Sequence, residues 1–205
     1  MSVRSGKGDK GFTDLSFHKR ISKDSIDMDA IGDLDELDSY LGLVKSKMRL
    51  RKDKAVLEKI QHAIYTIISE IVIGAEKNKK LGPLLKEEDA EWIKGMVYQL
   101  EQKVEIESCF YLPGDGELSA ILDVTRTVAR RAERSVVGLF QKEKIRNTHV
   151  LTYLNCVSDV LFIMAREKAG KKGKVRPKAG KTGRPGKKAG GKGMAARKKR
   201  KKSAR

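Results

Sequence analysis

Phosphate chemistry is suggested by a glycine- and lysine-rich segment near the start of the chain. Residues 6–13 read GKGDKGFT, with three glycines, two lysines and a threonine hydroxyl. Glycines let successive backbone N–H groups point toward one centre, lysines neutralise phosphate, and a threonine hydroxyl can bind phosphate or a cation. The pattern matches neither the Walker A loop nor GxGxxG, and an ordinary flexible N-terminus has the same composition. Arg20 and Lys23 follow as further phosphate ligands or as solvated surface.

A second chemical signal is the arginine cluster RTVARRAER at residues 126–134. On a helix, Arg126, Arg130 and Glu133 share a face, because they are spaced by i+4 and i+7. Glu133 follows Arg130 by three residues and can orient one guanidinium, which leaves its remaining N–H groups for bidentate contacts to phosphate. The alternative is a solvated charged stripe, which is the commoner role of such a run.

Polar residues beside apolar helix faces give further candidates. Asn155 and Asp159 are four residues apart in an apolar segment. Either both bond to the neighbouring helix, or Asn155 faces a ligand. Asp35 lies at the edge of an earlier apolar face and can pair with a cation of another chain. Its neighbours Asp33 and Glu36 are more simply complements of the helix dipole. No Ser-His-Asp or Cys-His arrangement can be assembled, so the sequence offers no protein nucleophile.

Five helices must position these residues. They are expected over about 27–48, 53–75, 86–104, 118–141 and 144–168. Apolar residues recur every three or four positions, as at Leu34, Leu37 and Leu41. Residues 1–26 and 109–116 are interpreted as loops, since proline and glycines interrupt the second, and no strand pattern competes. Long helices with mostly short connections predict an all-α fold, a five-helix up-down bundle.

Positive charge is concentrated at the end of the chain. The 205 residues include 45 Lys and Arg against 27 Asp and Glu, a net charge of +18. Residues 168–205 hold 18 of the basic residues and no acid, so residues 1–167 are formally neutral. Because this tail has little apolar surface to offset its ordering entropy, we expect it to be disordered. The expected organisation is one domain, made of a phosphate-binding segment at 1–26 and a bundle at 27–168, with a Lys/Gly-rich tail at 169–205.

Composition also favours a cytoplasmic protein. The two cysteines, Cys109 and Cys156, form no disulfide framework and have no metal-ligand spacing. The first residues contain no apolar core of a signal peptide. No run of about 18 apolar residues indicates a membrane span.

These segments resemble the propanediol-utilisation type of ATP:cob(I)alamin adenosyltransferase over about residues 8–166. GDKGFT at 8–13 resembles the family's phosphate loop, and RISKD at 20–24 the basic step before its first helix. The remaining matching blocks are AIGDLDELDS at 30–39, FYLPG at 110–114, RTVARRAER at 126–134 and YLNCVSDVLF at 153–162. Because the blocks follow the family order, the chain is identified as a member.

The resemblance implies a homotrimeric bundle with active sites between subunits. It implies transfer of the 5′-deoxyadenosyl group of ATP to the cobalt of cob(I)alamin, with release of tripolyphosphate and with Mg²⁺ accompanying ATP. A corrinoid reductase and a B12-dependent enzyme are the implied partners. The nucleophile would then be Co(I), which explains why the protein needs no nucleophile of its own.

Site residues are carried over by matching position. The residues that would wrap the triphosphate are Gly8, Asp9, Lys10, Gly11 and Thr13, with Lys23 closing the loop. Arg130 would contact the phosphates, and Glu133 and Asn155 would hold the nucleotide. Arg126 would pair with Asp35 across the subunit interface. Phe110 would lie against the lower face of the corrin and exclude an axial ligand there. Arg130, Asp35, Arg126 and Phe110 are the expected catalytic set.

Two alternatives stand beside this interpretation. The chain could be a helical module whose tail binds nucleic acid, and such binding would be non-specific because the tail has no aromatic residue to stack on bases. It could also be a homologue that keeps the bundle without catalysis. Against such loss stands the joint retention of six expected site residues, Lys10, Asp35, Arg126, Arg130, Glu133 and Asn155.

Overall fold

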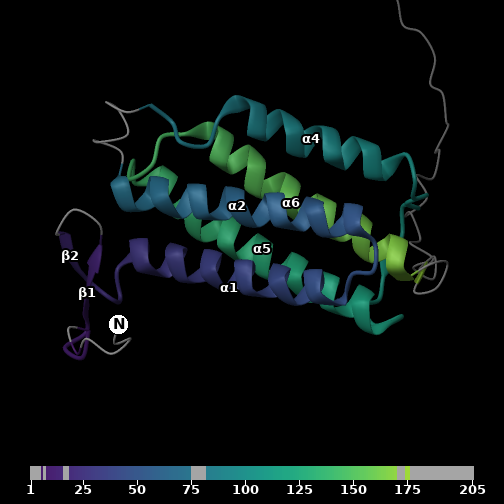
Figure 1. Cartoon of the computed structure of the whole chain (residues 1–205), viewed down its shortest axis with the longest axis horizontal. Coiled ribbons are helices and arrows are strands. Elements are labelled where there is room, and N and C mark those ends of the chain that lie inside the picture. The colour runs from purple at the N-terminus through teal and green to yellow at the C-terminus, as the bar shows by residue number, and fades with distance from the viewer. Residues whose placement is uncertain (1–5, 7, 16–18, 75–81, 170–173, 176–205) are drawn as a thin grey trace, which may run out of the picture. The chain divides into compact units, whose positions relative to one another are not determined.

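Five helices form the described part of the chain. The structure, a computed structural model, describes residues 6, 8–15, 19–74, 82–169 and 174–175. The helices in this part are α1 (Ile26–Lys47), α2 (Arg51–Ile73), α4 (Glu87–Glu101), α5 (Glu117–Gln141) and α6 (Thr148–Ala169). They lie lengthwise beside one another, and each runs opposite to the helix before it (Figure 1). The predicted five-helix up-down bundle is confirmed.

Helix α5 lies at the centre of the packing. It contacts both α1 and α6, while α2 packs on α1 and α4 packs on α6. Lys59 on α2 places its Nζ 4.1 Å from the ring centroid of Trp92, which joins α2 to α4. The periodic residues Leu34, Leu37 and Leu41 have no exposed surface. The apolar faces read from the sequence therefore form the core.

Local chemistry sets the helix ends. Ser25 caps α1 by accepting a hydrogen bond from the Met28 backbone N–H at 3.4 Å. Helix α2 ends at Gly74, whose φ of +76° lies in the left-handed region that favours glycine. Helix α6 begins at Thr148 rather than near residue 144. The reason is Asn147, whose Oδ1 accepts the His149 backbone N–H at 3.0 Å while its Nδ2 donates to the Leu85 carbonyl.

Two short β ribbons correct the expectation that no strands form. Strands β1 (Phe12–Leu15) and β2 (Lys19–Ser22) make an antiparallel hairpin. Strand β3 (Phe110–Tyr111) pairs antiparallel with β4 (Lys174–Val175). Strands of two to four residues are too short for alternation to be recognised in a sequence. The expected disorder of the tail is wrong for Ala169 and for Lys174–Val175, and the rest of 169–205 lies outside the described residues.

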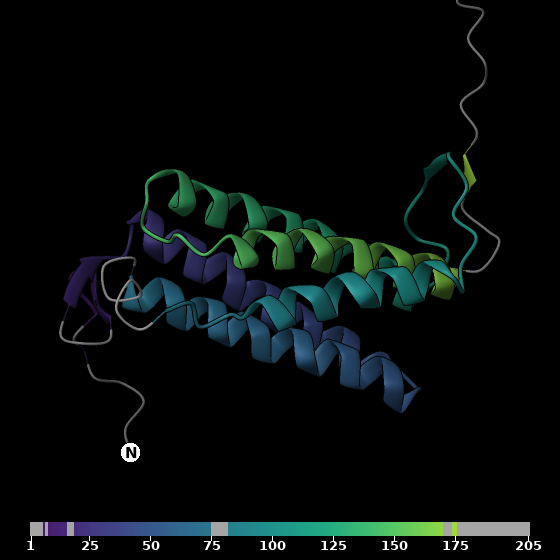
Figure 2. The same cartoon turned by 90° about the horizontal axis from the view of Figure 1, so that it is seen from above.

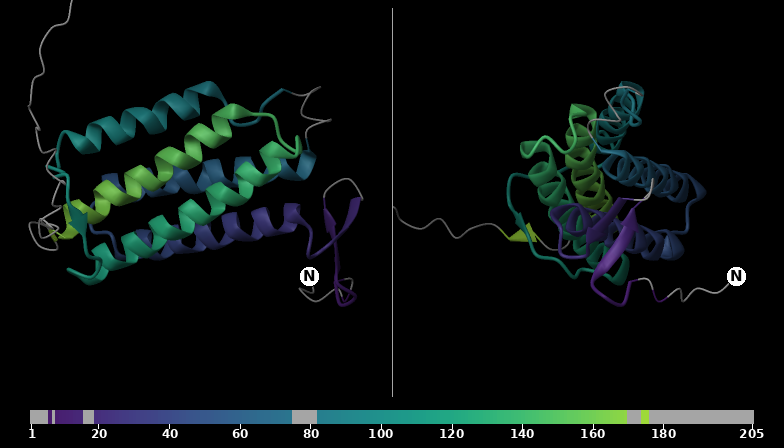
Figure 3. Two further views of the ribbon diagram at one scale, coloured as in Figure 1. Left: turned by 180° about the vertical axis from the view of Figure 1, so that it is seen from behind. Right: turned by 90° about the vertical axis from the view of Figure 1, so that its left-hand side faces the viewer.

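The two ribbons lie at opposite ends of the bundle. The hairpin leads into α1 within a few residues, whereas β3 precedes the start of α5 (Figure 2). Lys47 at the end of α1 binds Glu117 at the start of α5, at 2.6 Å. The view from behind shows the same separation (Figure 3). Since α1 has 22 residues, its length of about 33 Å separates the two ends.

Helix α6 is a core helix of this bundle. Among the described residues it is the one helix long and apolar enough to cross a membrane, with a mean hydropathy of 1.3 over an 18-residue window. More than half of that window is buried inside the bundle. Its apolar residues are therefore accounted for by packing against α5 and α4.

Candidate functional site

The hairpin carries the residues of the expected phosphate loop. Gly11 has a φ of +77°, which allows its N–H to bond the Gly8 carbonyl at 3.3 Å while its own carbonyl accepts the Lys23 N–H at 2.9 Å. A Cβ atom at Gly8 would lie 3.0 Å from Nζ of Lys23, so the ammonium group covers this glycine closely. The structure thus brings Lys23 to the loop, with Lys10 exposed beside it.

Neighbouring arginines of α5 have different surroundings. Arg131 faces α1, where its Nε lies 2.9 Å from Asp33 Oδ1 and its Nη2 pairs with Glu36. Ser135 also donates to Asp33. These acids, expected to complement the helix dipole, instead join α1 to α5. The Arg131 guanidinium therefore stabilises the packing of α1 on α5.

Arg130 is exposed on the side of α5 that meets α6. Partial burial raises the pKa of the Asp159 carboxyl on α6, and the Arg130 guanidinium acts in the opposite direction. The two groups therefore interact electrostatically. Within the described part of the chain no ion pair joins Arg130 to Glu133, so the expected orientation of Arg130 by Glu133 is absent. The backbone carbonyl of Arg130 accepts a hydrogen bond from Nη1 of Arg134 at 3.0 Å.

Arg126 and Asp35 are not brought together within one chain. Arg126 Nε lies 3.7 Å from Asp123 Oδ1 on the same helix, and it has no hydrogen-bond acceptor among the described residues. Asp35 is exposed on α1. There it acts on the Tyr65 hydroxyl of α2, whose pKa is raised first by Asp38 and to a smaller extent by Asp35.

An open cavity of about 470 Å³ is lined by α6 residues that follow Asn155, the predicted nucleotide residue of this helix. Its lining residues are Glu101, Val104, Ile106, Asp159, Phe162 and Ile163. Phe162 contacts Tyr111 of β3, and the adjacent Phe110 is 74% exposed. Asn155, four residues before Asp159, is also exposed rather than buried in the helix seam. Asp159 and Phe162 thus line one cavity, with the charge of Arg130 acting on Asp159 and the strand of Phe110 held against Phe162.

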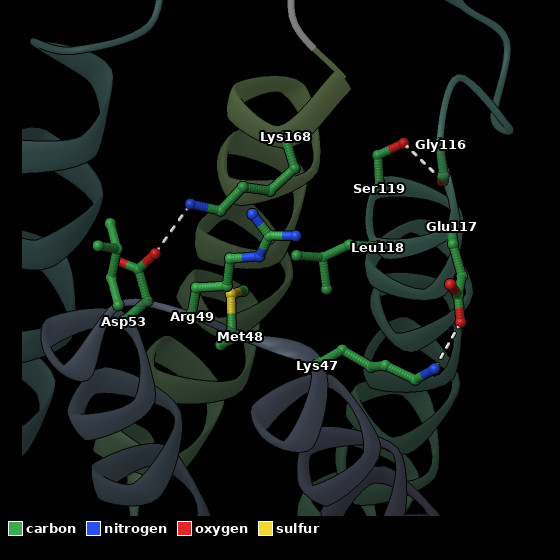
Figure 4. Close-up of a pocket in the computed structure, with 10 residues that line it drawn as sticks. Lys47, Met48, Arg49, Asp53, Gly116, Glu117, Leu118, Ser119 and Lys168 are labelled. Carbon is green, nitrogen blue, oxygen red and sulfur yellow. Dashed lines mark hydrogen bonds and ion pairs between the residues drawn. The ribbon is translucent and has the colours of Figure 1, made fainter.

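A second cavity, of about 700 Å³, lies where α1, α2, α5 and α6 meet (Figure 4). Its polar side chains largely pair with each other, Lys168 with Asp53 at 2.8 Å and Lys47 with Glu117 at 2.6 Å. None of the expected site residues lines it. These ion pairs close the end of the bundle.

The residues that hold the strand of Phe110 in place were not predicted from the sequence. Phe162 and Arg166 contact Tyr111 of that strand, and Asp123 binds Arg166. None of these four residues was given a role of its own from the sequence. The FYLPG and YLNCVSDVLF blocks include two of them, which was the available signal. As for metals, the described residues include no group of three or more His, Cys, Asp or Glu side chains that could hold an ion.

Comparison with known sequences identifies the family. The chain belongs to the cobalamin adenosyltransferase family, whose model matches residues 3–168. It is 36% identical over 160 residues to a cobalamin adenosyltransferase of Cupriavidus metallidurans, covering 78% of this chain and 83% of the relative. It is 32% identical over 177 residues to a corrinoid adenosyltransferase of Bacillus subtilis, covering 84% and 89%. The family expected from the sequence is confirmed.

Solved structures agree with this assignment. A Phe-to-Ala variant of a PduO-type ATP:corrinoid adenosyltransferase from Lactobacillus reuteri, complexed with cobalamin and ATP, superposes with a TM-score of 0.75. The two chains are 30% identical, and the match covers 82% of this chain and 93% of the other. An Arg-to-Lys variant from the same organism, complexed with ATP, gives a TM-score of 0.73 at 30% identity, with 82% and 94% covered.

Proposed function

We propose that this chain transfers the 5′-deoxyadenosyl group of ATP to the cobalt of cob(I)alamin. The observation that carries the proposal is the cavity lined by Asp159 and Phe162, with Arg130 acting electrostatically on Asp159 and the exposed Phe110 on the strand that contacts Phe162. A cation for a polyphosphate and an apolar, aromatic recess for a corrin would then be adjacent. Family membership supplies the reaction that needs both.

Different residues would bind the triphosphate and the nucleoside of ATP. Gly8, Asp9, Lys10, Gly11 and Thr13 would surround the triphosphate, with the Lys23 ammonium already against Gly8. Arg130 would bind the phosphates, and Glu133 and Asn155 would orient the nucleoside. No group of three ligating side chains occurs in the described part of the chain, so Mg²⁺ would be bound mainly by phosphate oxygens of ATP.

The corrin would occupy the 470 Å³ cavity and its open edge, with Phe110 against its lower face. There the ring would exclude water or an axial base, which favours reduction of the cobalt to Co(I).

The chemistry requires alignment rather than a protein base. The Co(I) electron pair attacks C5′ of ATP, a Co–C5′ bond forms, and the C5′–O5′ bond breaks to release tripolyphosphate. The residues of the chain then contribute by holding C5′ over the cobalt and by placing Lys10, Lys23 and Arg130 near the charge that develops on the leaving group.

The active sites would lie between the subunits of a homotrimer. Within one chain the hairpin and Phe110 are separated by the length of α1, so a complete site requires the hairpin of another copy. Arg126 and Asp35, unpaired with each other in one chain, would meet across this interface. The phosphate-binding segment 1–26 and the bundle 27–168 would together form the domain of each subunit.

The remaining roles concern the surroundings of the enzyme. A cytoplasmic location, a corrinoid reductase that supplies Co(I), and a B12-dependent enzyme that accepts the product are consistent with this chemistry. Non-specific contacts of the tail with nucleic acid would be a separate property, since residues 176–205 carry 14 Lys and Arg and no acid.

A spectral assay tests the proposal. Purified protein with ATP, Mg²⁺ and chemically reduced cob(I)alamin should yield a light-sensitive adenosylcobalamin spectrum, and omission of ATP is the control. If Co(I) is verified in the cuvette and that spectrum is absent, the chain is an inactive homologue and the proposed activity is refuted.

A further inference from the structure

Tyr111 fixes the strand that carries Phe110. Its hydroxyl accepts a hydrogen bond from the Glu107 backbone N–H at 2.9 Å. Its ring meets Phe162 edge-on, with centroids 5.9 Å apart and an interplanar angle of 78°. Successive side chains of a strand point to opposite sides. Because Tyr111 packs inward onto α6, Phe110 points away from it and remains 74% exposed.

A buried arginine lies against Tyr111. The Arg166 guanidinium carbon is 5.0 Å from the Tyr111 ring centroid and 5.4 Å from that of Phe162, and only 5% of the residue is exposed. Its Nε and Nη1 have no hydrogen-bond acceptor among the described residues. Burying such donors is unfavourable, and two aromatic faces offset part of that cost by cation–π attraction. The rings therefore serve as partners of Arg166.

Asp123 connects this cluster to α5. Arg166 Nη2 donates to Asp123 Oδ2, and both side chains are almost fully buried. The other oxygen, Asp123 Oδ1, lies 3.7 Å from Nε of Arg126, which we expect at the subunit interface. The Asp123 carboxylate thus lies between two arginines. Arg166 contacts Tyr111, and Arg126 is expected to reach a neighbouring subunit.

We propose that Arg166 and Asp123 are positioning residues for Phe110. Asp123 orients Arg166, Arg166 and Phe162 hold Tyr111, and Tyr111 fixes the direction of Phe110. The inference rests on the proposed adenosyltransferase function, in which Phe110 meets the corrin. Loss of this support leaves the lower face of the corrin open to an axial ligand. Nucleotide binding is unaffected, because Arg130 lies two turns from Asp123 along α5.

Three variants separate this role from general stability. Arg166→Met removes the guanidinium but leaves Asp123 without its partner. Tyr111→Leu removes the aromatic ring and leaves the Arg166–Asp123 ion pair intact, so it is the milder test. Lys168→Met is the matched control, since Lys168 lies on the same helix two residues further and pairs with Asp53 at 2.8 Å, at the cavity of Figure 4.

Hydrogen exchange gives a readout that does not depend on activity. In both Arg166→Met and Tyr111→Leu, backbone amides of residues 107–115 should exchange about tenfold faster than in the parent protein. The helices, and the same segment in Lys168→Met, should exchange as before. Unchanged exchange of residues 107–115 in Tyr111→Leu, or a change spread over all helices in both variants, would overturn the proposal.

Kinetics and spectroscopy then test the link to the corrin. Both variants should lower kcat for adenosylation about tenfold and leave the KM for ATP unchanged. Electron paramagnetic resonance of bound cob(II)alamin with ATP should lose the splitting from the axial base nitrogen in the parent protein and retain it in the variants. Parent-like kcat and spectra in variants with faster exchange would refute the positioning role. Failure of the parent protein to form adenosylcobalamin would refute the proposed function, and the exchange rates would still decide whether Arg166 holds the strand.

Discussion

Phe110 and Tyr111 are adjacent on β3 and face opposite ways. Tyr111 packs against Phe162 of α6, whereas Phe110 is 74% exposed. An aromatic ring exposed to this extent is accessible to a ligand or to another chain. The proposed function therefore gives the two residues different tasks, since Tyr111 anchors the strand and Phe110 would meet the corrin.

Replacing Phe110 by Ala should separate activity from stability. We expect kcat to fall about tenfold or more, because the corrin loses the ring that excludes its lower ligand. The free energy of unfolding should change by less than about 0.5 kcal/mol, because the side chain is mostly exposed. Adenosylcobalamin formation and thermal melts measure the two. A variant that melts much earlier, or that keeps full kcat, would contradict this division of tasks.

The adjacent arginines of α5 should behave oppositely. Arg130→Ala should lower kcat/KM for ATP about 100-fold, as loss of a phosphate-binding cation does, and leave the melting temperature unchanged. Arg131→Ala removes the contacts to Asp33 and Glu36, which we expect to cost about 1 kcal/mol, or about 2–4 °C in Tm for a chain of this size. Activity of folded Arg131→Ala should stay near that of the parent. The reverse pattern would exchange the roles assigned to these two residues.

The bundle could be predicted from sequence because its signal is long and periodic. Leu34, Leu37 and Leu41 recur at helical spacing, and each is fully buried as that spacing requires. Strand β3 gives no such signal, because it has two residues and its partner β4 comes after the whole of α5 and α6. The sequence therefore predicts a loop where the structure has a ribbon.

The candidate site could be predicted only as a set of residue types. Periodicity places Arg130 and Arg131 on one helix, but adjacent positions differ by about 100° around its axis. Which of them meets α1 depends on Asp33, 98 residues earlier than Arg131. Likewise, Arg166 belonged to an apolar helix without an assigned role. Its burial between Tyr111, Phe162 and Asp123 results from tertiary packing, which a single sequence does not encode in any local pattern.

Two truncations should differ sharply. Ending the chain after Val175 should leave kcat unchanged, since only residues 176–205 are removed and none of them is an expected site residue. Ending it after Ala169 also removes β4, which pairs with Phe110–Tyr111, and should lower kcat about tenfold. Steady-state assays on both truncations decide, and equal activities would show that β4 does not support Phe110.

The same pair of truncations tests the tail. Gel retardation with DNA should weaken steeply with salt for the full chain and vanish when the 14 basic residues after Val175 are removed. Persistent binding by the shortened chain would place the nucleic-acid contact in the bundle instead.

Asp159 should make stability depend on pH. Partial burial raises the pKa of its carboxyl in the folded protein, with Arg130 opposing the shift. Between the unfolded pKa of about 3.9 and the raised folded value, the folded state binds more protons, so stability falls as pH rises. Asp159→Asn should therefore raise Tm at pH 7, and the gain should disappear near pH 3.5. Thermal melts across this range measure it, and an equal gain at both pH values would rule out titration as the cause.

Complementation between two impaired variants tests whether the sites lie between subunits. Lys10→Ala impairs the phosphate loop at one end of the chain, and Phe110→Ala impairs the corrin face at the other. In a ring of three subunits, each interface joins the hairpin of one copy to the face of the next. Any hybrid trimer then contains one interface built from two intact halves.

Co-expressed and separately tagged subunits allow such hybrids to be isolated. They should recover about one third of the parent kcat per trimer, whereas each variant alone keeps about a tenth of it or less. Mixing separately folded trimers without subunit exchange is the control. Inactive hybrids of the expected mass would mean that loop and corrin face act within one chain. That outcome would require the hairpin to cross the roughly 33 Å length of α1, against its direct connection to the start of that helix.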